Sequence, residues 1–228
     1  MTARKFDDFA EDYDDIHVKN LGVFGGEAEA FTAYKMDYLR ELAPTVAGPV
    51  LEFGCGVGRN LPYLAEAYPG AALVGADVSG ESLKAAVRLC PACEFRLLST
   101  PADLAARGPE FDLIFVSNVF HHIPPPEAPA WVGALRAVCR PGARLVVFEH
   151  NPLNLLTRLI VARCPFDEDA VLLQPARLMG LVEEGGFQVR RARYTLVFPW
   201  RTKLLHKIEK VLGMLPLGCQ YYVLAQAD

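Results

Sequence analysis

Residues 48 to 150 alternate short apolar runs, rich in β-branched residues, with periodic segments rich in Ala and Leu. This alternation is the pattern of βαβ units, in which a helix returns the chain to start the next parallel strand. The pattern predicts strands at 49–53, 72–77, 94–98, 111–117 and 143–149, and helices at 59–68, 80–89 and 127–138. The segment "RPGA" at 140–143 is predicted to end the last helix and return the chain to a strand, because Pro and Gly stop helices.

Two later runs, 187–198 and 219–226, have the composition of strands that close the sheet. Two further helices are predicted before the first strand, near 6–15 and 25–42. With 228 residues the chain is long enough for one sizeable core, and we expect a single α/β domain over 1–228.

Charge and hydropathy limit the partners of the chain. The formal net charge of -4 argues against a dedicated nucleic-acid binder, since such proteins use a basic excess to displace counterions from phosphate. No stretch approaches the roughly 18 uninterrupted apolar residues of a membrane span, and the start is acidic where a signal peptide would be basic and then apolar. We therefore expect a soluble cytoplasmic protein, either monomer or homodimer.

The segment 200–217 is the exception to the acidic balance. It places apolar residues at helical spacing with bases on the other face. A basic amphipathic helix can lie on a membrane surface or bind an acidic partner. We favour the simpler interpretation, a helix packed across the domain or over its pocket.

The six cysteines stand in mostly apolar contexts, which favours reduced thiols over a disulfide framework. Cys90 and Cys93 form a CxxC pair without a second pair or a nearby histidine. Buried structural thiols are therefore a better interpretation than zinc or redox chemistry.

The stretch "LEFGCGVGRN" at 51–60 places three glycines in five positions directly after the first predicted strand. Glycine lets a ligand approach the main chain, permits a positive φ, and exposes helix N-terminal amides. The dinucleotide fingerprint GxGxxG would need glycine at position 59, which is Arg59. The Gly-Lys-Ser/Thr of a phosphate-binding P-loop is also missing.

In this register the stretch resembles the first motif of class I S-adenosylmethionine-dependent methyltransferases, (D/E)-x-G-x-G-x-G. Glu52, Gly54, Gly56 and Gly58 match it position by position, with Cys55 between the glycines. The resemblance implies a Rossmann-like doubly wound sheet of seven strands, mostly parallel, with an antiparallel last strand. It also implies that the loop contacts the amino-acid part of S-adenosyl-L-methionine, whose ammonium Glu52 binds directly or through water, and that S-adenosyl-L-homocysteine is the product.

Other contacts with the cofactor follow from the same resemblance. Asp77 ends the second strand, where a carboxylate can accept both ribose hydroxyls, and Val78 matches the position that packs against adenine. Asn118 falls at the end of the fourth strand, near the methyl group. The acid that many relatives carry after the third strand is missing from "LLSTPADL", so the adenine amino group is assigned to Ser99, Thr100 or the later Asp103.

The rest of the chain is assigned around this core. We expect a helical cap or lid over 1–45, the cofactor-binding core over 46–150, and an acceptor-side insert with the closing strands over 151–228. Tyr13 of the lid is included as a cofactor contact. The mixed apolar and acidic segment 164–173 is expected to be a loop over the site.

Methyl transfer needs alignment of the reacting atoms in a dry pocket, and a general base only where the acceptor loses a proton. His150, which ends strand five, and His121, with His122 beside it after strand four, are the candidate bases, because imidazole titrates near neutrality. No metal site is predicted, since adjacent histidines leaving a strand rarely face one ion. The sequence "SNVF" after strand four lacks the prolines of enzymes that methylate nucleic-acid bases.

The sequence therefore favours methylation of a small molecule, with oxygen slightly preferred over nitrogen. Three alternatives stay open: an NAD-type oxidoreductase, a non-catalytic or regulatory relative of the same fold, and an enzyme whose acceptor lies in a lipid or on a membrane surface.

Overall fold

The computed structural model describes residues 28–198 and 202–228. Its seven strands are β1 (Val50–Phe53), β2 (Leu73–Asp77), β3 (Glu94–Leu97), β4 (Phe111–Ser117), β5 (Cys139–His150), β6 (Phe187–Thr195) and β7 (Gln220–Ala227). The longer described helices are α3 (Ala28–Leu42), α4 (Leu61–Ala67), α5 (Gly80–Leu89), α6 (Pro101–Ala105), α7 (Ala128–Ala137), α8 (Leu155–Val161), α9 (Pro175–Glu184) and α10 (Lys203–Leu212). The predicted helix 6–15, Tyr13 and Trp200 lie outside the described residues.

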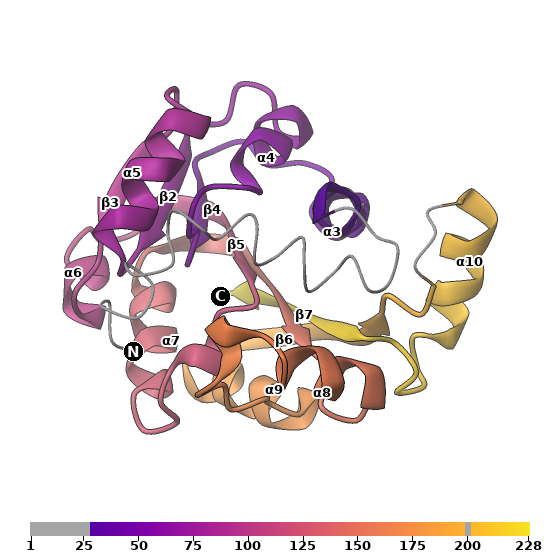
Figure 1. The fold of residues 1–228 in the computed structure, drawn as a ribbon. Coiled ribbons are helices and arrows are strands. Elements are labelled where there is room, and N and C mark those ends of the chain that lie inside the picture. Colours follow the sequence, from indigo (N-terminus) through magenta and orange to yellow (C-terminus); the bar gives the residue numbers. More distant parts are fainter. Residues whose placement is uncertain (1–27, 199–201) are drawn as a thin grey trace.

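All seven strands form one sheet in the order β3-β2-β1-β4-β5-β7-β6 (Figure 1). β1 pairs in parallel with both β2 and β4, while β7 is antiparallel to β5 and β6. The chain builds outward from β1 to β3 and then crosses back to start β4 on the other side of β1. Ligands bind in the crevice beyond the strand ends at such a point, so the fold places the site after β1 and β4. The predicted seven-stranded, mostly parallel sheet is confirmed.

Helices cover both faces of the sheet and divide the core in two. On one face, Trp131 of α7, Leu178 of α9 and Leu104 of α6 pack against buried residues of the central strands. On the other face, Leu39 of α3 and Leu64 of α4 join a second buried cluster. Central strands buried on both sides explain the nearly continuous apolar runs that the sequence shows at β1 and β4. Within the described ranges, no helix is long and apolar enough to cross a membrane.

The segment "RPGA" has a different role from the one predicted. Helix α7 ends at Ala137, and β5 already begins at Cys139, so Arg140, Pro141 and Gly142 belong to the strand. Cys139 pairs with Phe111, and the register then shifts before pairing resumes between Arg144 and Leu113. A proline, which cannot donate to the ladder, is tolerated at such an irregularity.

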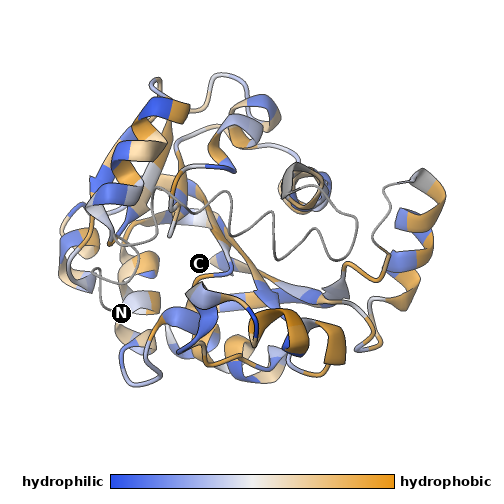
Figure 2. Ribbon diagram, viewed as in Figure 1, coloured by the Kyte–Doolittle hydropathy of each residue, from blue (hydrophilic) through white to orange (hydrophobic). Residues whose placement is uncertain are grey.

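Helix α10 forms where the sequence predicts it, but it packs through a polar side chain. Glu209 is 2% exposed, and its carboxylate accepts hydrogen bonds from the Tyr38 hydroxyl at 2.7 Å and the Val197 amide at 2.9 Å. Leu204 and Val211, which the helical spacing assigns to the apolar face, are 67% and 75% exposed. Figure 2 shows the alternation of hydrophobic and hydrophilic residues along this outer helix.

Candidate active site

The glycine loop leaves β1 in a tight turn that three left-handed residues produce. Gly54, Gly56 and Gly58 have φ values of 71°, 52° and 85°. A side chain at Gly54 would meet Val119 at 2.4 Å, and one at Gly58 would meet Ala86 at 2.9 Å. These two glycines are therefore required by packing within the protein.

Gly56 differs from its two neighbours, because a Cβ atom there would meet no protein atom within 4 Å. The residue lines a cavity whose wall also includes Gly54, Asp77, Asn118 and His122. The middle glycine thus leaves open space beside the main chain, which is where a bound ligand can approach the backbone.

Glu52, inside β1, is buried below this loop with 1% exposure. Its Oε1 accepts a hydrogen bond from the side-chain amide of Asn60 at 2.6 Å. Its Oε2 is buried and has no hydrogen-bond partner. Burial raises the pKa of Glu52 to about 8, against the opposing effects of Asn60 and the Lys35 ammonium. An unpartnered buried carboxylate oxygen is costly, and a ligand that donates to it would repay that cost.

Asp77 ends β2 and supports the loop. Its Oδ2 accepts from the Gly56 amide at 2.8 Å, and its Oδ1 accepts from the Ser79 amide at 2.9 Å. Asp77 therefore ties the open glycine to the next strand while it lines the cavity.

The opposite wall comes from β4 and from helix α3. Asn118 follows β4 with a φ of 57°, a left-handed conformation that asparagine adopts more readily than most residues, and its Oδ1 accepts from Gln220 at 3.3 Å. Lys35 of α3 is 8% exposed, and its Nζ donates to the Ser117 hydroxyl at 2.6 Å. Burial lowers the pKa of Lys35 to about 8. Thr32, one turn earlier on α3, lines the same cavity.

Beside this wall lies a buried cluster of histidines and acids centred on Glu149 of β5. Glu149 is 1% exposed and accepts hydrogen bonds from the Val119 amide at 3.0 Å and the Phe120 amide at 2.7 Å. Its other oxygen lies 2.6 Å from Nδ1 of His121, which is also 1% exposed. The carboxylate thus fixes both the turn after β4 and the orientation of the imidazole.

A third segment completes this cluster. Asp167, in the short 3-10 helix Pro165–Asp167, has its Oδ1 3.4 Å from Nε2 of His121 and 3.4 Å from Nε2 of His122. The predicted loop 164–173 therefore does lie against the histidines, and the Val171 amide donates to the His121 carbonyl at 2.8 Å. The His150 ring centroid is 5.0 Å from that of His121.

The surroundings push the pKa values of the three histidines apart. Burial alone would lower the pKa of His121, but the carboxylates of Glu149 and Asp167 raise it to about 9. Burial and the charge of His121 lower the pKa of His150 to about 4 and that of His122 to about 3. The three rings therefore differ in how readily they take up a proton, and His121 is the most basic of them.

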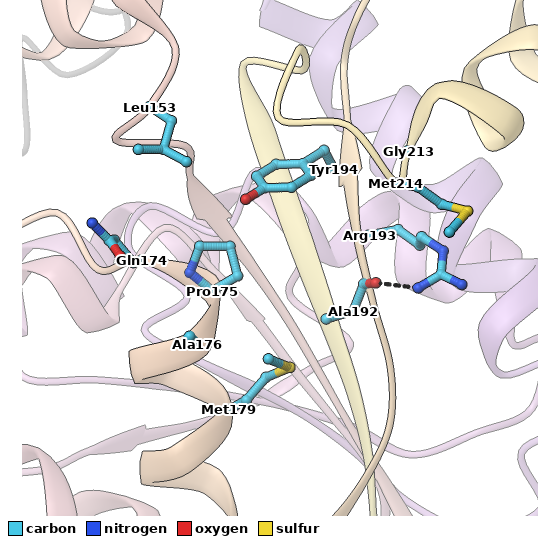
Figure 3. A pocket seen from close by; sticks show the side chains of 10 residues that line it. All are labelled: Leu153, Gln174, Pro175, Ala176, Met179, Ala192, Arg193, Tyr194, Gly213 and Met214. Atoms are coloured by element: carbon cyan, nitrogen blue, oxygen red, sulfur yellow. Dashed lines mark hydrogen bonds between the residues drawn. The ribbon is translucent and has the colours of Figure 1, made fainter.

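A second cavity of about 350 Å³ lies at the outer edge of the sheet, between α9, β6 and the segment that follows α10. Figure 3 shows its largely apolar wall, with Met179 on α9 and Tyr194 on β6. None of the residues predicted as site residues lines it. The cavity at the glycine loop is smaller, at about 130 Å³, yet it gathers Gly54, Gly56, Asp77 and Asn118.

Comparison with known proteins agrees with this geometry. Residues 51–145 match the family model described as "Methyltransferase domain". An uncharacterized methyltransferase of Synechocystis sp. is 30% identical over 157 residues, which cover 67% of this chain and 73% of that protein. The chain belongs to the class I S-adenosylmethionine-dependent methyltransferases.

Other relatives of this methyltransferase carry names with an acceptor. The ubiquinone/menaquinone biosynthesis C-methyltransferase UbiE of Syntrophotalea carbinolica is 30% identical over 189 residues, covering 70% of this chain and 77% of that protein. The trans-aconitate 2-methyltransferase of Azoarcus sp. is 34% identical over 99 residues, covering 42% of this chain and 38% of that protein.

Solved structures show the same fold. A methyltransferase of Thermotoga maritima superimposes over 99% of both chains with a TM-score of 0.70 at 16% identity. The magnesium protoporphyrin IX methyltransferase of Synechocystis, solved with bound S-adenosylmethionine, covers 88% of this chain and 79% of its own with a TM-score of 0.58 at 18% identity.

The cofactor of this methyltransferase is S-adenosyl-L-methionine, as its family membership implies. Glu52 does not line the cavity, but its Oε2 is buried without a hydrogen-bond partner, and the space beside Gly56 is open to a ligand. Asp77 lines the same cavity. This family assignment removes the NAD-type oxidoreductase alternative.

Of the remaining predicted cofactor contacts, Cys55 lines the cavity, whereas Val78, Ser99 and Thr100 do not. Cys55 lines the cavity as a buried thiol whose pKa burial raises, and Val78 packs partly buried against the core. Ser99 and Thr100 are exposed and do not line the cavity; their amides donate to Asp103 in the capping box of α6.

The sequence places Lys35 on the helix predicted at 25–42, where it suits a lid over the site, but it does not predict the contact of Lys35 with Ser117 in the cavity wall. The residue lies on a helix that precedes the first strand and belongs to no motif. Its only signal is a lysine among the apolar positions of an otherwise buried helix face.

Proposed function

We propose that this methyltransferase methylates a small molecule, with oxygen preferred over nitrogen as the acceptor atom. The observation that carries the proposal is the polar wall opposite the glycine loop, where Lys35, Asn118 and His122 line one cavity. Small-molecule sites combine a concave pocket with a few placed polar groups, and these three side chains are groups of that kind. The names of the relatives, which include a trans-aconitate and a quinone methyltransferase, support a small acceptor.

When bound, the cofactor supplies a methyl group on a sulfonium, whose sulfur leaves without protonation. In our proposal Glu52 accepts from its ammonium, Asp77 accepts from its ribose hydroxyls, and Gly56 allows it to approach the backbone. Asn118 borders the position of the methyl group at the end of β4. These residues align donor and acceptor, which is the main demand of an in-line displacement.

His150 is the proposed base for an acceptor hydroxyl, because its ring lies beside the cluster, with its centroid 5.0 Å from that of His121. His121, the second candidate, has Nδ1 held by Glu149 and Nε2 facing Asp167. We propose that His121 holds the neighbouring rings in position and contributes a positive charge to the cluster. Asp167, in the insert that starts at 151, contacts both His121 and His122.

An acceptor screen tests the proposal. The protein is incubated with S-adenosylmethionine and panels of small hydroxylated acids, phenols and amines, and release of S-adenosylhomocysteine is measured. We expect turnover with at least one oxygen acceptor, slowed in His150→Ala with unchanged affinity for S-adenosylhomocysteine. The matched control is His206→Ala, since His206 contacts Glu41 and does not line the cavity. Turnover with none of the panels would instead favour the non-catalytic alternative.

A second candidate, an acceptor presented at a lipid surface, rests on the exposed apolar residues of two helices. Leu155 and Leu159 of α8 are 77% and 44% exposed, and Leu204 and Val211 of α10 are 67% and 75% exposed. Figure 2 shows α8 mostly in the colour of hydrophobic residues. The side-chain amide of Asn154 donates to the Leu217 carbonyl at 2.8 Å, so the start of α8 adjoins the segment after α10.

Co-sedimentation with anionic vesicles distinguishes this candidate. Leu204→Glu combined with Val211→Glu should abolish sedimentation, whereas Leu97→Glu should not, because Leu97 is 58% exposed on β3 at the other edge of the sheet. Absence of sedimentation at low salt for the unmodified protein ends this second candidate.

A further inference from the structure

Three side chains from two distant segments bring potential metal-ligating atoms together next to the cofactor cavity. His121, His122 and Asp167 each offer one nitrogen or oxygen, and these atoms all lie within 4.8 Å of one another. His121 and His122 are adjacent in the 3-10 helix Phe120–His122. The turn places both Nε2 atoms at the same distance from Oδ1 of Asp167.

The contacts of Asp167 are longer than typical charge-assisted hydrogen bonds. Such N–H···O contacts are about 2.7–2.9 Å long, whereas Oδ1 of Asp167 lies 3.4 Å from each Nε2 atom. Ligands at about 2.05 Å from a tetrahedral zinc ion are about 3.3–3.4 Å apart. Ligands at about 2.1 Å in an octahedral site are about 3.0 Å apart. The two distances from Asp167 are therefore those of a tetrahedral site, and the third pair of ligand atoms lies within 4.8 Å.

The other side of the cluster has the form of a support for metal ligands. Metal-ligating histidines almost always donate their second ring nitrogen to a carboxylate or carbonyl, which fixes the tautomer. Nδ1 of His121 lies 2.6 Å from Glu149, and Glu149 is itself held by the amides of Val119 and Phe120. This arrangement directs Nε2 of His121 toward Asp167.

We propose that His121, His122 and Asp167 bind a divalent transition metal ion, most consistent with Zn²⁺, through Nε2, Nε2 and Oδ1. Three protein ligands leave one tetrahedral position open, as in catalytic zinc sites. His122 also lines the cavity that contains Gly56 and Asn118, so the proposed site adjoins the cofactor side. The sequence predicts no metal site, and this proposal departs from that prediction.

A metal at this position would define the class of acceptor, and this step rests on the proposed function. The ion would bind an acceptor that carries a hydroxylate, carboxylate or similar oxygen ligand, and it would hold that oxygen beside the cavity wall formed by Asn118. A divalent charge also lowers the pKa of a ligating hydroxyl. We therefore infer that the acceptor is a small oxygen chelator rather than a simple amine.

Metal binding is measured on the full chain with Zn²⁺ and Co²⁺ alone. Sγ of Cys90 lies 2.6 Å from Sγ of Cys93, and this thiol pair could bind zinc independently. The experiment therefore uses Cys90→Ser combined with Cys93→Ser as the parent protein. Stoichiometry comes from elemental analysis after dialysis, affinity from calorimetry, and coordination geometry from the visible spectrum of the Co²⁺ form.

We expect one Zn²⁺ per chain and a tetrahedral Co²⁺ spectrum without thiolate bands. His122→Ala and Asp167→Asn should each weaken Zn²⁺ binding by at least about 100-fold, the upper end of what loss of a supporting carboxylate costs. His206→Ala is the control, because His206 also pairs with a carboxylate, at 3.0 Å from Glu41, and should bind Zn²⁺ like the parent. Thermal unfolding verifies that each variant is folded.

Two outcomes overturn the proposal: substoichiometric Zn²⁺ in a folded parent protein, or equal Zn²⁺ affinity in the parent and Asp167→Asn. Titration with S-adenosylhomocysteine separates this failure from that of the proposed function. If the protein binds S-adenosylhomocysteine and methylates a small molecule without binding Zn²⁺, only the proposal of a metal site is wrong. If it binds Zn²⁺ and methylates no small molecule, the metal site is supported and the proposed function is wrong.

Discussion

Replacement of Gly56 by alanine separates the backbone role of this glycine from its role in binding. Gly56 has a φ of 52°, and a Cβ atom there would meet no protein atom within 4 Å. Gly108 offers a matched control, since its φ is 68° and its Cβ position is equally open, but it does not line the cavity. Both substitutions therefore impose the same kind of backbone strain.

The expected magnitudes follow from this match. An alanine in the left-handed region costs roughly 1–2 kcal/mol, which lowers the Tm of a chain of this size by about 2–8 °C in both variants. In Gly56→Ala the new methyl group also holds the cofactor away from the loop. Loss of about two hydrogen bonds, one of them to a charged group, costs about 3 kcal/mol, or roughly 100-fold in Kd.

Isothermal titration with S-adenosylhomocysteine and thermal unfolding measure the two effects separately. We expect equal losses of Tm in the two variants and a loss of affinity only in Gly56→Ala. Affinity in Gly56→Ala within about threefold of the unmodified protein would refute the reasoning, and so would an equal loss of affinity in Gly108→Ala.

Four further substitutions, one of them in a pH series, test other parts of the account. Asp77→Ala should weaken S-adenosylhomocysteine binding at least 100-fold, by about 3 kcal/mol for two lost charged hydrogen bonds, and unchanged calorimetric affinity would contradict the ribose contact. His150→Ala should lower kcat while the same titration gives an unchanged Kd; a weaker Kd would place His150 at the cofactor. Glu209→Ala should lower the Tm by about 6–12 °C, since buried donors worth about 3 kcal/mol lose their acceptor, and an unchanged Tm would contradict the packing of α10. Because the pKa of Glu52 is raised to about 8, ligand-free protein carries this proton at neutral pH, and binding of an ammonium should release it. The affinity for S-adenosylhomocysteine should therefore rise from pH 6 to pH 8, and Glu52→Gln should remove that rise; a pH-independent affinity in the unmodified protein would contradict it.

The cofactor side of the site was predictable because its residues lie in one local pattern. Glu52 lies in one strand, the three glycines follow that strand and Asp77 ends the next, so the topology of parallel strands alone brings them together. The same local logic gave the strands of the sheet to within a few residues.

The acceptor side could not be predicted in this way, because its residues come from separate segments. Lys35 reaches the cavity from a helix before the sheet, and Asp167 reaches the histidines from a segment after it. Helix α10 shows a related limit. Its spacing indicates an apolar buried face, yet the donors of Tyr38 and the end of β6 need an acceptor, and Glu209 supplies it from the polar face.

The most direct test of the proposed function uses S-adenosylmethionine with a labelled methyl group. The protein is incubated with it and with a cell extract, and small molecules are then separated from macromolecules by ultrafiltration. The account predicts label in the small-molecule fraction, strongly reduced with Gly56→Ala and unaffected by Gly108→Ala. Label that appears only in the macromolecular fraction would contradict it.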